Sequence, residues 1–412
     1  MIKPSSRWID WPKPSTFDRE IAIIKEKMRG KREILDLTEG DPVIHGHINK
    51  KLSELLIEAA KGDWHMYPEQ TPWREELRRA IRDFEKRYRK IDYDPDKIII
   101  GPGVAGCFQI LHYSLLEPGD EMVVIEPAHY LTGPTSYWYY FGSKIQTCPC
   151  DEENCWEPIV EELPSKITNR TKGIVIVNPN NPTGAVYDEK SIKAIIDIAG
   201  EFELPIISDE IYGLITFDGV ISKPTALLSK DVPVISLSGM SKVFMAPGWR
   251  VGYICFHDPE EKLSELLKVV KRVSMLYGHG VTAMPTPILY AATRAFQDSI
   301  DAGIEMTKRL NIRRDYIMKR IKEIDGITCV KPKGSLYCFP KVEGIGRIWK
   351  TDEEFMLELV KEENVIFNIG SRYGPSGFSH FRLLLLPDLK ILEEVLNLSL
   401  IHISEPTRPL YI

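Results

Sequence analysis

The chain has 412 residues, of which 43% are hydrophobic and 27% are charged, and its formal net charge is −6. This is a globular composition with length enough for two domains, and it contains no block of like charge that would indicate a nucleic-acid-binding arm. No run reaches the roughly 18 apolar residues of a membrane helix, and the N-terminus lacks the apolar core of a signal peptide. We therefore expect a cytoplasmic protein without membrane or nucleic-acid partners.

Residues 46–295 carry short apolar runs, each followed by a longer amphipathic stretch. The runs are rich in β-branched residues and apolar on both faces, as strands of a buried parallel sheet should be. In the stretch 191–203, Ile192, Ile195 and Ile196 share one face of a predicted helix. This alternation predicts a large three-layer α/β/α domain with a mostly parallel sheet. The strands are expected at Lys97–Gly101, Glu121–Pro127, Gly173–Pro179, Pro205–Glu210, Pro233–Gly239 and Gly252–Phe256.

A glycine-rich turn follows the first of these strands, in the stretch "IIIGPGVAGCFQIL". A helix is predicted to begin around Val104, directly after the turn. Free N–H groups and the helix dipole make such a helix start suitable for binding an anion.

Three cysteines lie close together further along, in "CPCDEENC": Cys148, Cys150 and Cys155. Clustered thiols raise the alternative of a zinc site, but the spacing is not that of a usual zinc pair and no fourth ligand is near. We expect a loop between two elements here, and no metal. The total of seven cysteines is odd, which argues against a disulfide framework.

Polar residues interrupt the chain where the predicted strands end, which is where parallel sheets bind ligands. In "VNPNNPTG", the asparagines Asn180 and Asn181 either bind a ligand or serve turn formation alone. In "IISDEIYG", Asp209 follows buried residues and needs a partner, unless it caps a helix that begins after it. Tyr212 is placed to face the same site.

The stretch "SLSGMSKVFMAPGWRVGY" puts Lys242 just after a strand and Arg250 one short loop further on. A lysine at the edge of a buried sheet is costly to keep charged, which suits an amine that must attack a carbonyl. Arg250 suits a phosphate, which it can bind in a bidentate manner. The alternatives are an ordinary loop lysine and an arginine paired with a carboxylate.

The last third of the chain reads as a smaller α+β domain over residues 296–397, joined by the N-terminal segment 1–45. It contains the strand-like "GITCVKPKGSLYCFPKV", the helical "DEEFMLELVKEE" and the apolar strand "HFRLLLLP". Arg382 lies in that apolar strand, either in a structural ion pair or as a ligand-binding residue.

Taken together, these residues describe one ligand. An aldehyde suits Lys242, a basic ring nitrogen suits Asp209, and a phenolic oxygen suits Asn181 and Tyr212. A phosphate suits Arg250 and the glycine-rich turn. The ligand that has all four groups is pyridoxal 5′-phosphate (PLP), which serves as an electron sink.

The ordered motifs "NPNNPTG", "SDEIYG", "SK" and "GWRVGY" resemble those of the class I/II aminotransferases, PLP enzymes of fold type I. The resemblance extends from Leu37 to Pro387 and is strongest to the alanine/tyrosine aminotransferase branch. Such enzymes are usually homodimers in which the partner lends a tyrosine to the phosphate, and Tyr67 is the candidate for that role.

The resemblance also implies a role for each matching residue. Lys242 would form the Schiff base and carry the proton, Asp209 would hold the ring nitrogen, and Arg382 would bind the substrate carboxylate. The remaining implied contacts involve Asn181 and Tyr212 at the ring oxygen, Arg250, Gly103, Val104 and Ala105 at the phosphate, and Gly40 against the substrate.

Some positions depart from the family pattern. The glycine-rich turn lacks the usual hydroxyl, so Gly103, Val104 and Ala105 offer backbone only. The position three before Lys242, often a serine in the family, is Gly239, and Ser238 or Ser241 is the candidate to compensate. The ring that stacks on the cofactor would be His129 or its neighbour Tyr130.

The expected activity is transfer of an amino group from an alanine-type donor to a 2-oxo acid such as 2-oxoglutarate, by a ping-pong cycle. A PLP-dependent β-lyase is the alternative, because fold does not fix reaction. A PLP-sensing regulator is the least favoured reading, because the chain has no room for an added DNA-binding domain.

The stretch from Leu398 to Arg408 resembles the conceptual translation of a transposase adapter used in sequencing libraries. We therefore expect residues 398–412 to be a non-native tail that packs poorly. Its removal after Asn397 is expected to leave activity unchanged.

Overall fold

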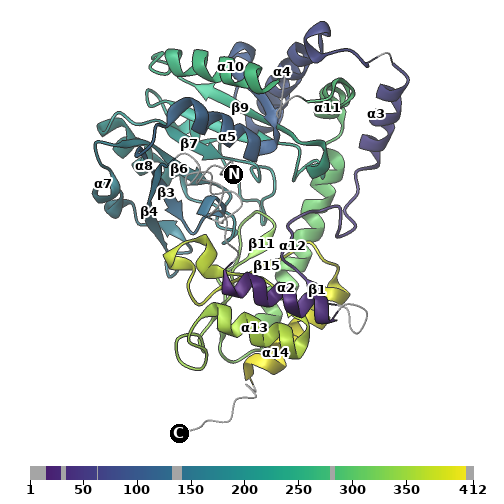
Figure 1. Cartoon of the computed structure of the whole chain (residues 1–412), viewed down its shortest axis with the longest axis vertical. Helices are drawn as coiled ribbons and strands as arrows, with labels where there is room; N and C mark the ends of the chain where they lie inside the picture. Colours follow the sequence, from purple (N-terminus) through teal and green to yellow (C-terminus); the bar gives the residue numbers. More distant parts are fainter. Residues whose placement is uncertain (1–14, 29–33, 63, 132–141, 279–283, 405–412) are drawn as a thin grey trace, which may run out of the picture.

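The computed structural model describes residues 15–28, 34–62, 64–131, 142–278 and 284–404. An eight-stranded sheet dominates the molecule, with the strand order β2-β9-β8-β7-β6-β3-β4-β5 (Figure 1). The inner strands β8, β7, β6, β3 and β4 are mutually parallel, as predicted. The sheet comprises β2 (Ile98–Pro102), β3 (Glu121–Glu126), β4 (Lys144–Asp151), β5 (Glu157–Pro158), β6 (Thr171–Val177), β7 (Ile206–Asp209), β8 (Val234–Gly239) and β9 (Val251–His257).

Strand β9 runs antiparallel to both of its neighbours, β8 and β2. The reason is the length of its connection: residues 240–250 cannot contain the crossover of a dozen or more residues that a parallel neighbour needs. This short connection is the loop that carries Lys242 and Arg250.

Apolar side chains alternate between the two faces of the sheet, and each face has its own core. Val123 and Ile125 of β3 belong to one core, while Val124 belongs to the other. Helices α4 (Trp73–Phe84), α8 (Glu189–Glu201) and α11 (Thr286–Asp298) contribute to the first core. Helices α5 (Gly103–Leu115) and α10 (Ser264–Gly278) cover the opposite face. The result is the predicted α/β/α sandwich.

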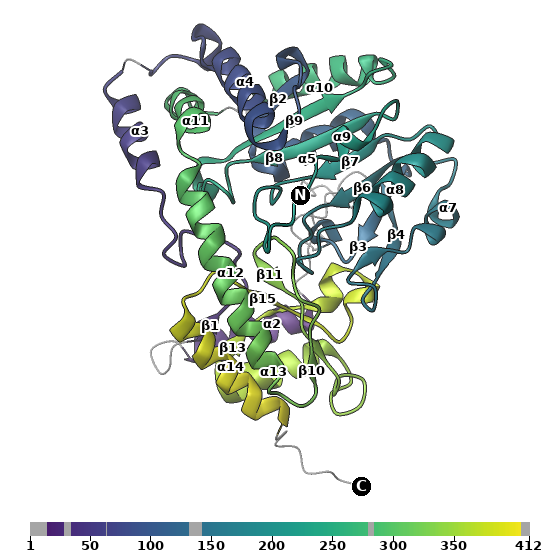
Figure 2. The ribbon, with the colours of Figure 1, turned by 180° about the vertical axis from the view of Figure 1, so that it is seen from behind.

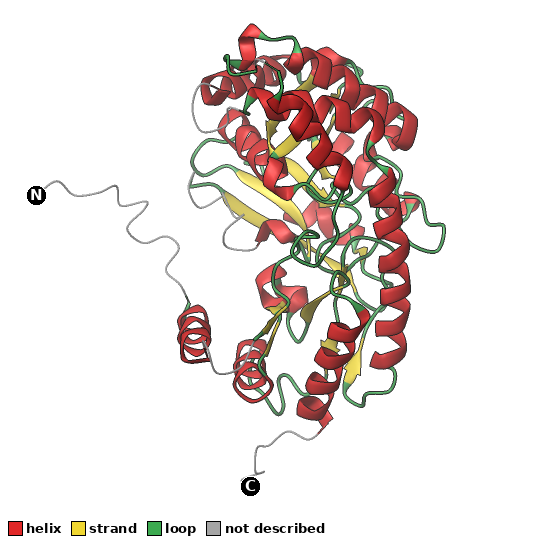
Figure 3. Cartoon of the chain, turned by 90° about the vertical axis from the view of Figure 1, so that its right-hand side faces the viewer, coloured by secondary structure: helices red, strands yellow, loops and turns green. Residues whose placement is uncertain are grey.

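Smaller sheets form a second layer of structure below the large sheet (Figure 3). One has the order β11-β15-β14, another pairs β10 with β12, and a third pairs β1 with β13. Figure 2 shows the long helix α12 (Asp301–Ile321) descending from the large sheet to this region. The strands are β1 (Leu35–Asp36), β10 (Ile327–Thr328), β11 (Tyr337–Cys338), β12 (Lys341–Val342), β13 (Val365–Ile366), β14 (Asn368–Ile369) and β15 (Phe381–Leu384).

The N-terminal helix α2 (Thr16–Met28) lies beside α13 (Asp352–Glu363) in Figure 1. An ion pair between Asp18 and Arg372 ties α2 to the small sheets, and β1 pairs in parallel with β13. The other α-helices in the described residues are α3 (Lys50–Ala60), the single-turn α7 (Leu163–Lys166) and α9 (Thr225–Leu228), and α14 (Leu389–Ser404). The boundary predicted after Ala295 falls within α11 and stays a prediction.

One local expectation, the loop at the cysteine cluster, differs from the structure. Cys148 and Cys150 lie in β4 and only Cys155 lies in the turn that follows, so the cysteine cluster is mostly strand. No group of His, Cys, Asp or Glu in the described residues could hold a metal ion. Helix α14 continues to Ser404, and Leu398, the first residue of the expected non-native tail, lies half-buried against the core. The non-native origin and poor packing of residues 398–412 stay a prediction. Residues 405–412 lie outside the described part of the chain.

Within the ranges that the structure describes, no helix combines the length and the apolar character that a membrane span requires.

Candidate active site

Three parallel strands bring their polar C-terminal residues to the same edge of the large sheet. In the register of β6, β7 and β8, Val177 pairs with Asp209, and Asp209 pairs with Leu237. Asn181 follows β6 and Lys242 follows β8 by a few residues each. The side chains predicted from sequence therefore converge because parallel strands align their carboxyl ends.

Asp209 is buried at this edge, with 5% of its surface exposed. One carboxylate oxygen accepts a hydrogen bond from the Tyr130 hydroxyl at 2.8 Å, and the other accepts one from the Ile211 amide at 3.1 Å. Burial raises the pKa of Asp209 to about 6, and the neighbouring charge of Glu210 adds to the rise. A turn rather than a helix follows Asp209, so the helix-capping alternative is wrong.

A buried ion pair supports the chain directly after Asp209. Arg89 donates to Glu210 at 2.8 Å, and each side chain is 4% exposed. Glu210 also accepts hydrogen bonds from the Ser208 hydroxyl and the Thr225 amide, both at 2.9 Å. A Cβ at Gly213 would lie 2.0 Å from the Arg89 guanidinium, so a larger residue there would have to displace this guanidinium from its ion pair. The contacts of Glu210 thus fix the C-terminal end of β7 and the turn after it.

Lys242 reaches across the edge of the sheet to the N-terminal segment. Its Nζ donates to the Gly40 carbonyl oxygen at 2.6 Å. The half-buried ammonium has no carboxylate partner among the described residues, which fits an amine kept available for chemistry rather than for an ion pair.

Arg250 and the start of α5 together form a site for an anion. Helix α5 begins at Gly103, and the Arg250 guanidinium donates to the carbonyl oxygens of Pro102 and Pro247, each at 3.1 Å. A Cβ on Gly103 would lie 2.6 Å from the guanidinium. Val104 and Ala105 lie half-buried in the first turn of α5, with their amides unsatisfied by the helix itself. Arg250 contacts backbone carbonyl oxygens here, so the alternative of an arginine paired with a carboxylate is not what the structure shows.

Arg382 on β15 completes the opposite side of the site. Its guanidinium donates to the Asn181 side-chain oxygen at 3.1 Å and to the Thr38 carbonyl oxygen at 2.5 Å. The rings of Tyr337 and Tyr373 lie against it, with centroids at 4.4 and 5.5 Å. Arg382 is 5% exposed, and its Nε has no hydrogen-bond partner in the described residues. It bonds neutral groups rather than a carboxylate, so the structural ion pair weighed from sequence is not what holds it.

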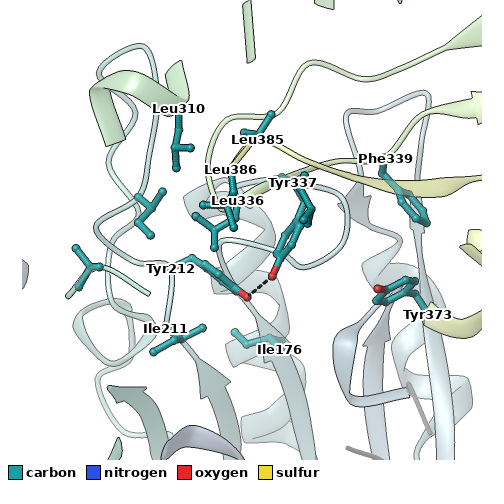
Figure 4. Close-up of a cluster of buried hydrophobic side chains, with 14 of the residues drawn as sticks. Ile176, Ile211, Tyr212, Leu310, Leu336, Tyr337, Phe339, Tyr373, Leu385 and Leu386 are labelled. Atoms are coloured by element: carbon teal, nitrogen blue, oxygen red, sulfur yellow. Dashed lines mark hydrogen bonds between the residues drawn. The ribbon is translucent and has the colours of Figure 1, made fainter. Parts of the chain in front are cut away.

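Two tyrosines meet in the middle of the site. The hydroxyls of Tyr212 and Tyr337 are 3.0 Å apart, as the dashed line in Figure 4 shows. Burial raises the pKa of Tyr212. For Tyr337 burial acts in the same direction, but the charges of Lys242 and Arg382 outweigh it and lower the pKa. Sequence reasoning missed Tyr337, although it sits in the strand-like stretch "GSLYCF" next to the predicted Arg382 strand.

His129 and Tyr130 take different positions. Tyr130 points its hydroxyl at Asp209, and its ring packs on Phe108 with centroids 4.0 Å apart. His129 is half-buried as a residue, and desolvation of its ring together with the charges of Arg382 and Lys242 lowers its pKa to about 3. His129 therefore faces the site as a neutral ring, and of the two it is the better placed to stack on a ligand.

The two other predicted residues, Ser241 and Tyr67, differ in exposure. Ser241 is half-buried on the turn before Lys242. Tyr67 is 76% exposed at the start of a short 3-10 helix, Pro68–Gln70. Asn180, by contrast, is wholly buried and bonds the Pro127 carbonyl oxygen and the Tyr187 hydroxyl, so it shapes the loop that carries Asn181.

The residues present fit PLP. Gly103 faces the Arg250 guanidinium without a side chain between them, since a Cβ there would lie 2.6 Å from the guanidinium. The absence of a side chain lets a phosphate approach the backbone closely. A buried carboxylate stands ready for a ring nitrogen at Asp209, and the unpartnered Nε of Arg382 leaves a donor for a carboxylate.

A three-layer α/β/α domain with this set of strand-end residues is the arrangement of an aminotransferase. Residues 32–391 match the family "Aminotransferase class I and II", and the chain belongs to that family. The predicted family, fold class and enzyme class are confirmed.

Among curated relatives, the chain is 32% identical over 322 residues to the glutamate-pyruvate aminotransferase AlaA of Haemophilus influenzae, covering 78% of each chain. It is 31% identical over 384 residues to aromatic-amino-acid aminotransferase 2 of Thermococcus litoralis, covering 92% of this chain and 94% of the relative. A solved alanine aminotransferase from Pyrococcus furiosus superposes with a TM-score of 0.87 at 36% identity, covering 98% of this chain and all of that one.

Proposed function

We propose that this aminotransferase uses PLP and moves the amino group of alanine, or of a similar small neutral L-amino acid, to a 2-oxo acid such as 2-oxoglutarate. The observation that carries the proposal is the joint placement of Lys242 and Arg382, which both donate to the N-terminal segment at Gly40 and Thr38. The relatives named as alanine and glutamate-pyruvate aminotransferases support the choice of donor.

Each side chain then has a defined task. PLP, when bound, withdraws electrons from the donor's α-carbon and carries the amino group between substrates. Lys242 Nζ would take and return the α-proton, while Asp209 would hold the ring nitrogen of the cofactor by a hydrogen bond. Arg382 orients the substrate by its α-carboxylate.

Other residues hold the cofactor in place. Arg250 and the amides of Gly103, Val104 and Ala105 are the proposed phosphate ligands, with Ser241 as a further hydroxyl. Asn181 and Tyr212 would bond the ring oxygen, and His129 would cover the ring.

We further propose that the protein is a cytoplasmic homodimer in which Tyr67 serves the partner's phosphate site. Apolar side chains support this assembly because several near Tyr67 in the chain are exposed: Ile44 at 63%, Ile48 at 62%, Ile57 at 59% and Met66 at 45%.

The experiment is a donor panel with 2-oxoglutarate, in which glutamate formation and pyridoxamine absorbance are followed together. Alanine should be preferred over aspartate, and the reverse preference would overturn the donor assignment. Release of ammonia and pyruvate from a donor that carries a leaving group on its β-carbon, instead of glutamate formation, would favour a β-lyase.

The catalytic assignment has its own test. Lys242→Ala should lower turnover by several orders of magnitude, because one amine serves as both nucleophile and proton carrier. Borohydride reduction of the unaltered protein followed by peptide mapping should place the cofactor on Lys242. A label on any other lysine would contradict the assignment.

A further inference from the structure

Two buried hydroxyls meet in the site, and the proposed function leaves one of them without a task. Tyr212 follows β7 and is the proposed partner of the ring oxygen, while Tyr337 lies on β11 of the smaller sheets. The hydroxyl oxygens are 3.0 Å apart (Figure 4), and the two residues are 3% and 1% exposed. In the described part of the chain neither hydroxyl has a second hydrogen-bond partner. One proton is therefore used within the pair, and the other is left for a ligand.

The charges around the pair decide which hydroxyl donates. The centroid of the Tyr337 ring lies 4.4 Å from Arg382 Cζ. Although burial opposes the change, the charges of Lys242 and Arg382 lower the pKa of Tyr337. Burial raises the pKa of Tyr212, and the charge of Asp209 adds to the rise. Because the more acidic hydroxyl is the better donor, Tyr337 donates to Tyr212, and the Tyr212 proton is the one left for a ligand.

The position of Tyr337 is fixed at both ends of its side chain. At the base, Tyr337 pairs with Leu384 of β15, and its chain neighbour Leu336 is fully buried beside the ring, as Figure 4 shows. At the tip, a Cβ on Gly40 would lie 2.4 Å from the hydroxyl oxygen. The smaller sheets therefore hold a hydrogen-bond donor against Tyr212, a residue that the large sheet supplies.

Hydrogen bonds that follow one another polarise each other, so a hydroxyl that accepts a bond donates its own proton more strongly. We propose that Tyr337 is a positioning residue, which orients the Tyr212 hydroxyl and strengthens the hydrogen bond that Tyr212 donates to the ring oxygen of PLP. The inference rests on the proposed function, since it takes that ring oxygen as the ligand of Tyr212.

The nitrogen of Lys242, once it is bonded to the cofactor, reports the strength of this hydrogen bond. When the nitrogen loses its proton, the neighbouring ring oxygen keeps a negative charge that no adjacent positive charge compensates. A donor on the oxygen therefore favours the deprotonated nitrogen, and a weaker donor should raise the pKa of the nitrogen. The absorbance of the bound cofactor changes with this proton, so the pKa can be measured without turnover.

The test is a pH titration of that absorbance in the PLP-loaded protein and its variants. Tyr212→Phe, which removes the donor to the ring oxygen, should raise the pKa by about 1–2 units. Tyr337→Phe should raise it by about 0.3 units, which is the share that polarisation contributes. In the Tyr212→Phe background, Tyr337→Phe should leave the pKa unchanged, because Tyr337 acts only through Tyr212.

Tyr373→Phe is the matched control, because it removes another buried hydroxyl beside the same guanidinium. Tyr373 is 2% exposed, and the centroid of its ring lies 5.5 Å from Arg382 Cζ. In the described residues the Tyr212 hydroxyl bonds Tyr337 and not Tyr373. The control should keep the pKa of the unaltered protein. An equal rise in the control and in Tyr337→Phe would overturn the proposal, because the effect would then not pass through Tyr212.

The remaining outcomes separate this proposal from the proposed function. If PLP gives the unaltered protein no absorbance that titrates, and borohydride fixes no cofactor on Lys242, the proposed function fails. If the absorbance titrates but Tyr337→Phe leaves the pKa unchanged, or raises it equally in the Tyr212→Phe background, only the role of Tyr337 fails. An unchanged pKa in Tyr212→Phe would remove Tyr212 from the ring oxygen and would overturn the role of Tyr337 with it.

Discussion

Asp209 makes the stability of the cofactor-free protein depend on pH in an unusual direction. Its folded pKa of about 6 lies above the ordinary value of 3.8, because burial disfavours the carboxylate. Between these values the folded chain binds a proton that the unfolded chain does not. The free energy of unfolding should therefore fall by up to about 3 kcal/mol as pH rises through this window.

Asp209→Asn is the variant that checks this. Asparagine cannot titrate, so the part of the pH dependence that comes from Asp209 should vanish between pH 4 and 7. Urea denaturation of both cofactor-free proteins across that range measures the difference. Identical slopes for the two proteins would contradict the assignment.

At the level of single residues, the sequence predicts the groups that lie at strand ends. Lys242, Asp209 and Asn181 could be found because parallel strands must deliver their last residues to one edge. Tyr337 and the hydrogen bond from Tyr130 could not be found, since both depend on how the small sheets pack against the large one.

Arg89 closes a short π-helical turn, Glu85–Arg89, and supports β7 from behind. Arg89→Met would leave Glu210 buried without its counter-charge, and should lower the free energy of unfolding by about 3–5 kcal/mol. Arg79→Met is the control: Arg79 is 61% exposed in its ion pair with Glu76, so its loss should cost under about 1 kcal/mol. Equal losses in the two variants, measured by urea denaturation, would disprove the supporting role.

Strand β9 meets the start of α5 at Gly252. A Cβ there would lie 2.3 Å from the Gly103 carbonyl carbon, so Gly252→Ala must push the strand and helix apart. We expect PLP affinity to fall at least about 10-fold, since phosphate binding depends on the geometry of this helix start. Gly248→Ala, with nothing within 4 Å of its Cβ, should bind PLP normally. Fluorescence titration with PLP compares the two variants. Equal affinities would argue against a phosphate site at the start of α5.

At the level of elements, regular patterns were predicted well and irregular ones were not. Helix α8 buries Ile192, Ile195 and Ile196 on the face that their spacing indicated. The second half of strand β4, which lies in the cysteine cluster, was predicted to be a loop, because the sequence of β4, "KIQTCPCD", mixes polar residues and a proline with few β-branched ones. It is the penultimate strand of the sheet and is only partly buried, so its apolar signal is weak.

In the whole molecule, Glu152 joins the large sheet to the smaller ones. It follows β4 and contacts Lys341 at 2.8 Å and His380 at 3.3 Å. Although burial opposes the change, these partners lower the pKa of Glu152 to about 2. The stabilisation is therefore present above about pH 4.5 and is lost as pH falls through about 2.

Glu152→Gln should accordingly lower the Tm at pH 7, with the difference from the parent shrinking at acid pH. Glu189→Gln, which breaks an exposed pair with Lys223, should shift the Tm much less. Scanning calorimetry at pH 3 and pH 7 provides the comparison. A Tm difference between Glu152→Gln and the parent that is larger at pH 3 than at pH 7 would contradict the prediction.

The contacts of Arg382 also set the order in which the protein can become active. Its two hydrogen-bond partners are 344 and 201 positions away in the sequence, so both ends of the chain must be in place before the guanidinium is oriented. Closing loops of that length costs entropy that only the finished packing returns. During refolding, helical structure should recover first and affinity for carboxylates last. A ribosome-bound chain that has not yet released its final strand would therefore hold a folded large sheet without a substrate site.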